Sequence, residues 1–388
     1  MSNPTPATPD SPDFAALGLA DTLLAALRRA GHARPTAIQT AAIPAVLGGA
    51  DVEAIARTGS GKTAAYALPL IQRLTDNPVP RLAATPRVLV LVPTRELAGQ
   101  VAAVFRDFGR QGGIRARLAI GGTPLDHQVA AMEDGVDVVI GTPGRVMDLL
   151  AQKALHLGAV AAMVLDEADR MLEEGFLDAM AEILPALPAH RQMLLFSATM
   201  PPAVAELAAR CLHRPQRIVL DAAGETPRQI RQRILFAEPA DKPSCAARIA
   251  QDGRFRRILF FTRTRQGADR LAGQLRQAGL RAEPLHGDLV QTRRTRTLRS
   301  FASGATPCLV ATDVAARGID IAEIDLVVNV DMPETPEAYI HRIGRTGRAG
   351  RRGMAITFCG ADERAMLRAI EKHLGQRLRV VTADAPLG

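Results

Sequence analysis

The sequence predicts an α/β protein with two domains, each containing a mainly parallel sheet flanked by helices. Short apolar runs that end in Gly, Thr or Asp alternate with helical patterns over the whole chain, which is typical of buried parallel strands linked by helices. The length of 388 residues also exceeds that of one ordinary compact domain.

The expected strands form two series. The first series is 51–56, 87–92, 136–141, 162–167 and 192–199. The second series is 257–262, 307–313, 326–331 and 354–359. Within the second, apolar residues at helical spacing, among them Ala268, Leu271 and Leu275, predict a helix over 266–280.

A polar segment with Gly and Pro, DAAGETPRQ (221–229), separates the two series and indicates a linker. The first residues are Pro-rich and acidic, which is typical of a disordered lead. The expected parts are a lead (1–11), a first domain (12–219), a linker (220–228), a second domain (229–376) and a short tail (377–388).

Composition restricts the class of protein. No apolar run is long enough to cross a bilayer, and the N-terminus lacks the basic and apolar regions of a signal peptide. The cysteines are scattered, which suits reduced thiols and indicates no metal site. We expect a cytoplasmic protein without membrane contact.

The positive charge is concentrated in the second part of the chain. Residues 229–388 hold 27 Lys and Arg against 17 Asp and Glu, whereas residues 1–228 hold 21 against 23. This asymmetry favours a polyanionic partner such as nucleic acid, with a solvated basic surface as the alternative. There is no Trp and there are only two Tyr, so nucleic acid should be held by its backbone rather than by base stacking.

The segment ARTGSGKT (56–63) follows the first strand and opens a helix. Gly59 and Gly61 let backbone N–H groups wrap around phosphates, Lys62 can reach the β- and γ-phosphates, and the Thr63 hydroxyl can ligate Mg²⁺. Ala56 replaces the first Gly of the general pattern. The alternative is a Gly-rich turn without a ligand. Lysine occurs at only four positions beside 44 arginines, so its presence here supports phosphate binding.

The segment LDEADRM (165–171) places carboxylates where an apolar run ends. Beside a phosphate loop, Asp166 would lie near bound Mg²⁺ and hold it through water, and Glu167 would orient and deprotonate the attacking water. The alternative is an ordinary acidic helix start with Asp166 as its N-cap.

Together with SAT (197–199), these motifs resemble the DEAD-box family of ATP-dependent RNA helicases. PTRELA (93–98), GG (121–122), TPGR (142–145), ATDVAARGID (311–320) and HRIGRTGR (341–348) follow in the family's order. FTRTRQGA (261–268), HGD (286–288) and the Arg-Gly run are closest to the bacterial RhlE-type branch. The resemblance covers residues 12–375 and implies two RecA-like domains that close over ATP and RNA at an interdomain cleft.

The resemblance also implies roles for individual residues. Phe14 should stack on adenine, unless it is an ordinary core anchor, and Gln39 in RPTAIQ (34–39) should read the adenine edge. Arg345 and Arg348 should reach the γ-phosphate as arginine fingers. The remaining ATP-site residues implied by the resemblance are Arg34, Thr36, Ala56, Arg57, Thr58, Gly59, Ser60, Gly61, Lys62, Thr63, Gly318 and Asp320. The coupling residues are Asp169, Ser197, Thr199 and His341.

The implied RNA contacts suit phosphates and sugars, which carry no sequence information. In the first domain they are Pro93, Thr94, Arg95, Gly121, Gly122, Thr142, Pro143 and Arg145. In the second they are Thr264, Gly287, Gln291, Arg294, Thr312 and Asp313. The run RRTRTLR (293–299) contributes to the basic excess, with a solvated helix face as its alternative.

The expected function is RNA-stimulated ATP hydrolysis, with ATP and Mg²⁺, coupled to opening short RNA duplexes or remodelling RNA–protein complexes. An ATP-gated RNA clamp or chaperone that scarcely unwinds shares the same motifs. A DNA translocase is disfavoured by the DEAD and adenine-reading motifs. We expect a monomer that binds RNA without sequence specificity. Ribosomal or RNA-decay proteins are its candidate protein partners.

Overall fold

A computed structural model describes residues 13–56, 59–220, 230–316, 324–347 and 353–382. The chain divides into two compact units, Met1–Ala223 and Gly224–Gly388, and this division falls within the predicted linker segment. No helix in the described ranges combines the length and apolar character that a membrane span requires.

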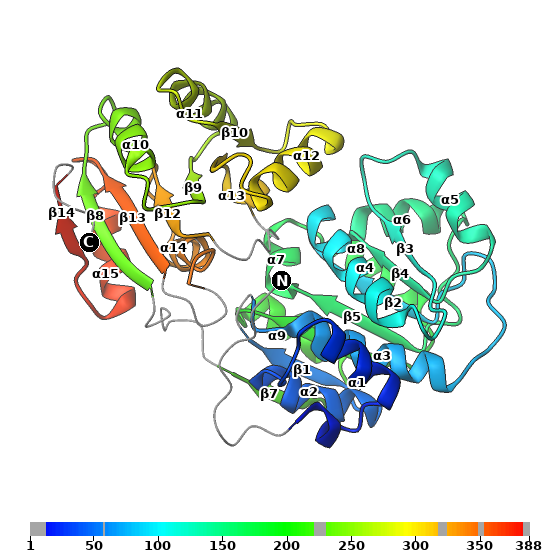
Figure 1. Ribbon diagram of the computed structural model, residues 1–388. Coiled ribbons are helices and arrows are strands. Elements are labelled where there is room, and N and C mark those ends of the chain that lie inside the picture. The colour runs from blue at the N-terminus through cyan, green and yellow to red at the C-terminus, as the bar shows by residue number, and fades with distance from the viewer. Residues whose placement is uncertain (1–12, 57–58, 221–229, 317–323, 348–352, 383–388) are drawn as a thin grey trace. The chain divides into compact units, whose positions relative to one another are not determined.

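The first unit is built on a seven-stranded sheet with the order β3-β4-β2-β5-β6-β1-β7 (Figure 1). Every pair of neighbouring strands is parallel. The strands are β1 (Val52–Ile55), β2 (Val88–Leu91), β3 (Ala116–Ala119), β4 (Val138–Gly141), β5 (Ala162–Asp166), β6 (Gln192–Ser197) and β7 (Gln216–Val219). The α/β class that the sequence predicts is confirmed.

Helices cover both faces of this sheet because side chains alternate along each strand. In β2, Val88 and Val90 pack into one core with η1 (Phe14–Leu17), α1 (Asp21–Arg29), α2 (Ala37–Leu47), α3 (Lys62–Asp76) and α4 (Arg95–Gly109). Leu89 and Leu91 pack into the opposite core. That core is covered by α5 (Leu125–Glu133), α6 (Pro143–Ala151), α7 (Ala168–Glu173), α8 (Leu177–Ile183), η2 (Leu184–Ala186) and α9 (Pro202–Cys211).

The second unit repeats this architecture. Its seven-stranded sheet has the order β10-β11-β9-β12-β13-β8-β14, with parallel neighbours throughout. The strands are β8 (Ile230–Phe236), β9 (Ile258–Phe261), β10 (Ala282–Leu285), β11 (Cys308–Ala311), β12 (Leu326–Asn329), β13 (Gly353–Cys359) and β14 (Arg379–Val381). The helices are α10 (Lys242–Gln251), α11 (Arg265–Gln277), α12 (Gln291–Ala302), α13 (Asp313–Ala316), α14 (Pro336–Ile343) and α15 (Arg364–Leu374).

The helices of the second unit also form two layers. Apolar residues of α10 and α11 pack on one face of the sheet, and residues of α12, α13, α14 and α15 pack on the other. Because the strand order matches that of the first unit, β8 and α10 occupy the positions that β1 and α3 occupy there.

Several strands were not predicted from the sequence. β3, β8, β10 and β14 lie at or beside sheet edges and lack a continuous apolar run. β8, for example, reads IRQRILF and has exposed or half-buried positions between buried ones. Edge strands need only one hydrophobic face, or none, so their pattern is weaker than that of central parallel strands.

Candidate functional site

Three neighbouring strands of the first unit carry the predicted nucleotide motifs at their carboxyl ends. β1 leads into the phosphate loop, β5 ends at Asp166, and β6 ends at Ser197. β6 pairs with both β1 and β5, so these motifs meet at one edge of the sheet. This edge is where parallel α/β sheets bind ligands.

The phosphate loop has the backbone that its glycines permit. Gly59 and Gly61 have φ values of 80° and 95°, and Gly61 caps α3. A Cβ atom on Gly61 would lie 2.5 Å from Nε2 of Gln39, so no other residue fits there without displacing that amide. Lys62 begins α3 and is buried, and its Nζ donates a hydrogen bond to the carbonyl oxygen of Ala56 at 2.8 Å.

Gln39 joins the predicted adenine-reading segment to this loop. Its Oε1 accepts a hydrogen bond from the backbone N–H of Thr36 at 3.0 Å, and its Nε2 donates to the carbonyl oxygen of Gly61 at 3.2 Å. The residue is buried, whereas Arg34 at the start of the segment is exposed. Gln39 therefore supports the loop as well as being the predicted adenine contact.

Phe14 is only 4% exposed and belongs to the hydrophobic core of the first unit, together with Leu17 of the same turn. This burial fits the alternative of a core anchor. Stacking on adenine stays a prediction.

Asp166 lies at the centre of the site and is almost completely buried. Burial raises the pKa of its carboxyl to about 6, with Lys62 opposing the rise and the charge of Glu167 adding to it. Tyr66 on α3 is also fully buried, and its hydroxyl donates to Oδ2 of Asp166 at 2.9 Å. Tyr66 was not predicted, because nothing in a helical sequence indicates which strand end a tyrosine will meet.

Several polar atoms around this edge have no hydrogen-bond partner among the residues that the structure describes. Oδ1 of Asp166, Oγ of Ser60 and Oγ1 of Thr36 are buried and make no hydrogen bond within the described ranges. Buried polar groups are normally paired, so unpaired ones indicate a ligand or water. A carboxylate and two hydroxyls beside a lysine suit a hard cation and phosphate oxygens.

Glu167 and Asp169 have different environments although they are close in sequence. Glu167 has the left-handed backbone of φ 56° and ψ 52°, which is unusual for a residue with a side chain, and its carboxylate pairs with Arg170. Asp169 instead accepts hydrogen bonds at 2.8 Å from both the backbone N–H and the hydroxyl of Thr199. The hydroxyl of Ser197 accepts a bond from the Asp169 backbone, so two predicted coupling residues and Asp169 are in direct contact.

The predicted RNA contacts of the first unit lie at the other half of the same sheet edge. Pro93, Thr94 and Arg95 follow β2, Gly121 and Gly122 follow β3, and Thr142, Pro143 and Arg145 follow β4. These three strands are neighbours.

Gly122 and Arg95 are packed closely in this half. Gly122 has a φ of 77°, and a Cβ atom there would lie 2.1 Å from Nη1 of Arg95. Arg145 donates to the carbonyl oxygen of Thr123 at 2.9 Å. Gln128 bonds both the N–H and the carbonyl oxygen of Ile120, which fixes the loop after β3.

The second unit places its predicted RNA residues in the corresponding half of its own sheet. Thr264 follows β9, Gly287 follows β10, and Thr312 and Asp313 follow β11, while Gln291 and Arg294 lie at the start of α12. The strands β10, β11 and β9 are neighbours.

Asp313 has a protein partner that was not predicted. Its two carboxylate oxygens each accept a hydrogen bond of 2.6 Å from the guanidinium of Arg342. Arg342 is buried and also stacks over the ring of Phe261 at 5.1 Å. The sequence placed Arg342 inside HRIGRTGR but gave no reason to pair it with a residue 29 positions earlier.

Arg345 is buried, and its Nε donates to the carbonyl oxygen of His341 at 3.2 Å. Both residues belong to the second unit, so the predicted links of His341 and Arg345 to the first unit stay predictions. Arg57, Thr58, Gly318, Asp320 and Arg348 lie outside the described residues.

The second unit has a lysine at the position of Lys62 but pairs it differently. Lys242 begins α10 and is buried like Lys62, yet its Nζ lies 2.8 Å from Oε2 of Glu363 and 3.9 Å from Oδ1 of Asp331. The Glu363 carboxylate also accepts hydrogen bonds from the N–H groups of Gly360 and Met332. An internal carboxylate thus takes the lysine that would otherwise be available to a phosphate.

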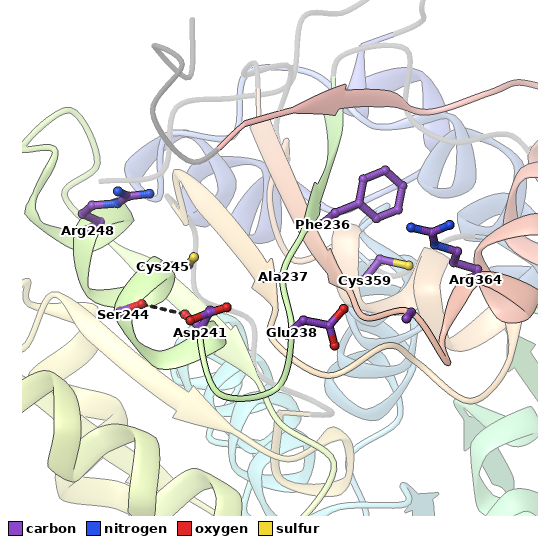
Figure 2. A pocket seen from close by; sticks show the side chains of 10 residues that line it. Phe236, Ala237, Glu238, Asp241, Ser244, Cys245, Arg248, Cys359 and Arg364 are labelled. Atoms are coloured by element: carbon purple, nitrogen blue, oxygen red, sulfur yellow. Dashed lines mark hydrogen bonds between the residues drawn. The ribbon is translucent and has the colours of Figure 1, made fainter.

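A cavity of about 460 Å³ lies next to this pair, at the carboxyl ends of β8 and β13 (Figure 2). Phe236 and Arg364 lie at one side of it, with the guanidinium 5.2 Å from the ring centroid. Glu238 and Asp241 also line it, so arginines and carboxylates are mixed. This mixed lining differs from the Gly-rich loop of the first unit.

Comparisons with known proteins agree with this geometry. The model of the DEAD/DEAH box helicase family matches residues 36–207, and the model of the helicase conserved C-terminal domain matches residues 241–350. The DEAD-box ATP-dependent RNA helicase CshA of Streptococcus pneumoniae is 40% identical over 366 residues, covering 94% of this chain and 69% of that protein.

The chain belongs to the DEAD-box family of ATP-dependent RNA helicases. The ATP-dependent RNA helicase DeaD of Escherichia coli is 42% identical over 374 residues, which are 96% of this DEAD-box chain but 58% of that longer protein. Among solved structures, Saccharomyces cerevisiae Dbp5 bound to RNA and ADP BeF3 superposes with a TM-score of 0.86 at 33% identity, covering 96% of each chain. The two units are therefore tandem RecA-like domains, as the resemblance implied.

Proposed function

We propose that this DEAD-box helicase hydrolyses ATP at the carboxyl edge of β1, β6 and β5 when RNA occupies the neighbouring edge of β2, β4 and β3. The observation that carries the proposal is the strand order. It places Lys62, Asp166 and the Ser197 segment together, and it places the predicted RNA residues on adjoining strands of the same sheet.

In this proposal different side chains bind the phosphates, hold Mg²⁺ and activate the attacking water. Lys62 binds phosphate oxygens after leaving the Ala56 carbonyl, and Thr63 and Asp166 would hold Mg²⁺, Asp166 through water. The ion would neutralise charge on the phosphates. Glu167 orients the attacking water and accepts its proton, which requires it to exchange its contact with Arg170. Arg345 and Arg348 are assigned to the charge that develops on the transferred phosphate.

Asp169 is proposed to couple the position of Glu167 at the nucleotide to the segment after β6. It ties the start of α7 to Thr199, while Glu167 lies two positions before it. A shift of Glu167 toward the nucleotide would therefore move the segment after β6. His341 is assigned to the same coupling on the resemblance alone.

The action on RNA is proposed to be local opening of short duplexes or remodelling of RNA–protein complexes, through backbone contacts without sequence preference. Saccharomyces cerevisiae Dbp5 bound to RNA and ADP BeF3 is a solved relative that supports this assignment. Placement in the RhlE-type branch, a monomeric state and the domain boundaries 12–219 and 229–376 are parts of the same proposal. A cytoplasmic location is supported by four cysteines that are all free thiols.

The test compares wild type, Glu167→Gln and a control, Glu206→Gln, which changes an exposed carboxylate on α9. ATP turnover is measured with and without single-stranded RNA, together with displacement of a short RNA duplex. Turnover should rise with RNA in wild type and control and be lost in Glu167→Gln. Turnover that ignores RNA, or a fully active Glu167→Gln, would contradict the proposal. RNA retention with ATP but no displacement would indicate a clamp instead.

A further inference from the structure

Helix α12 carries a groove whose chemistry the predicted RNA contacts do not use. A shallow groove of about 740 Å³ runs along the helix from Gln291 to Ala305 just beyond its end. It is lined by Gln291, Thr292, Thr295, Arg296, Arg299, Ser300, Ser303 and Ala305. Of these only Gln291 belongs to the RNA contacts that the resemblance implies.

The lining residues recur at helical spacing, so they form one stripe along α12. Thr297 and Phe301 are buried on the opposite side and fix the helix against the sheet. Arg296 and Arg299 are exposed, so their guanidinium groups are available on the stripe. A helix of 12 residues extends for about 18 Å, long enough to face more than one phosphate group.

The groove is purely basic in charge. Helix α12 contains no Asp or Glu, and no carboxylate lines the groove. Within the part of the chain that the structure describes, no ion pair is found for Arg296 or Arg299, whereas Arg342 and Arg170 are held by carboxylates. Unpaired arginines next to threonine hydroxyls are groups that bind phosphodiester oxygens.

We propose that the stripe of Arg296, Arg299 and Thr295 binds the phosphate backbone of RNA that extends beyond the predicted contacts at Gln291 and Arg294. The inference rests on the proposed RNA-binding function and adds a second stretch of strand to it. RNA is favoured as occupant because the groove begins at Gln291, so a strand held there continues directly onto the stripe. The contact would lengthen the RNA footprint without adding sequence preference.

The experiment uses the full chain with a short RNA that covers the predicted contacts alone and a longer RNA of the same core sequence. Kd is measured over a range of salt concentrations for wild type, Arg296→Gln/Arg299→Gln and Arg296→Lys/Arg299→Lys. The control is Arg368→Gln/Arg377→Gln, which removes two exposed charges from the end of the unit near β14, the sheet edge opposite β10.

The Gln double variant should bind the long RNA several-fold more weakly and the short RNA as wild type does. Its slope of log affinity against log salt should fall by about 1.4 for the long RNA, because each contact to a single strand contributes about 0.7. The Lys variant should keep most of the slope, which also shows that the helix is intact. RNA-stimulated turnover with the short RNA should be unchanged.

Equal binding of both RNAs by wild type and the Gln variant would overturn the inference, as would an equal loss for short and long RNA. A control that loses as much slope as the Gln variant would also overturn it, because the effect would then be one of net charge. Failure of the proposed function is distinguishable, since wild type itself would then show no RNA-dependent turnover.

Discussion

Replacing Tyr66 by Phe tests how the nucleotide site holds its central carboxylate. The substitution removes one oxygen, and with it the 2.9 Å hydrogen bond to Oδ2 of Asp166, from a place where both side chains are buried. A hydrogen bond to a charged group contributes about 1.5–3 kcal/mol. Each ~1.4 kcal/mol is a factor of ten, and loss of a residue that orients a metal ligand costs ~10–100-fold in metal affinity. Tyr66→Phe should therefore raise the Mg²⁺ concentration that gives half-maximal ATP turnover about tenfold or more.

The assay is ATP turnover with saturating RNA over a Mg²⁺ titration, with thermal unfolding measured in parallel. Tyr339→Phe is the matched control, because Tyr339 is the only other tyrosine and its buried hydroxyl donates to Oε1 of Gln232 at 2.8 Å. The control should lower stability by about 0.5–1.5 kcal/mol and leave the Mg²⁺ midpoint unchanged. The reasoning is refuted if Tyr66→Phe leaves that midpoint unchanged, or if both variants shift it equally.

Three further substitutions are expected to separate stability, RNA binding and coupling. Burial raises the pKa of Glu363, but hydrogen bonds from Gly360 and Lys242 outweigh burial and hold the pKa below its usual range. The ionised carboxylate therefore stabilises the folded state at pH values above that range, and this contribution is lost as the pH falls through the lowered pKa. Glu363→Gln should therefore destabilise the second unit by about 3 kcal/mol at neutral pH. In denaturant unfolding, the difference in the free energy of unfolding between the variant and wild type should disappear below about pH 4. A difference that does not change with pH would contradict this. Gly122→Ala should cost about 1–2 kcal/mol through its positive φ and should reduce RNA affinity by displacing Arg95, as measured by RNA titration; unchanged affinity would show that this loop does not contact RNA. Asp169→Asn should retain ATP binding but lower RNA-stimulated turnover and duplex displacement about tenfold, and a variant that loses ATP binding equally would argue against a coupling role.

Much of the fold followed from local patterns. Runs such as VLVL in β2 and ILFF in β9 are buried on both faces, so each predicted a central parallel strand with its location nearly correct. The phosphate loop was equally readable, because a tight turn around phosphates requires Gly at positive φ and the sequence places Gly59 and Gly61 there. The edge strand β10 was missed, since AEPL carries Glu and Pro and has no continuous apolar run, although most of it is buried.

The sequence by itself determined which residue types are available: a phosphate loop, a carboxylate cluster and a basic second half. Only the tertiary structure decided which of them meet. Tyr66 reaches Asp166 across 100 positions, and Lys242 reaches Glu363 across 121, because the strand order brings the ends of β1 and β5, and of β8 and β13, to one edge. Local sequence encodes burial and helical or strand period, whereas strand order is set by packing of the whole sheet, and the partner of each buried polar group follows from that order.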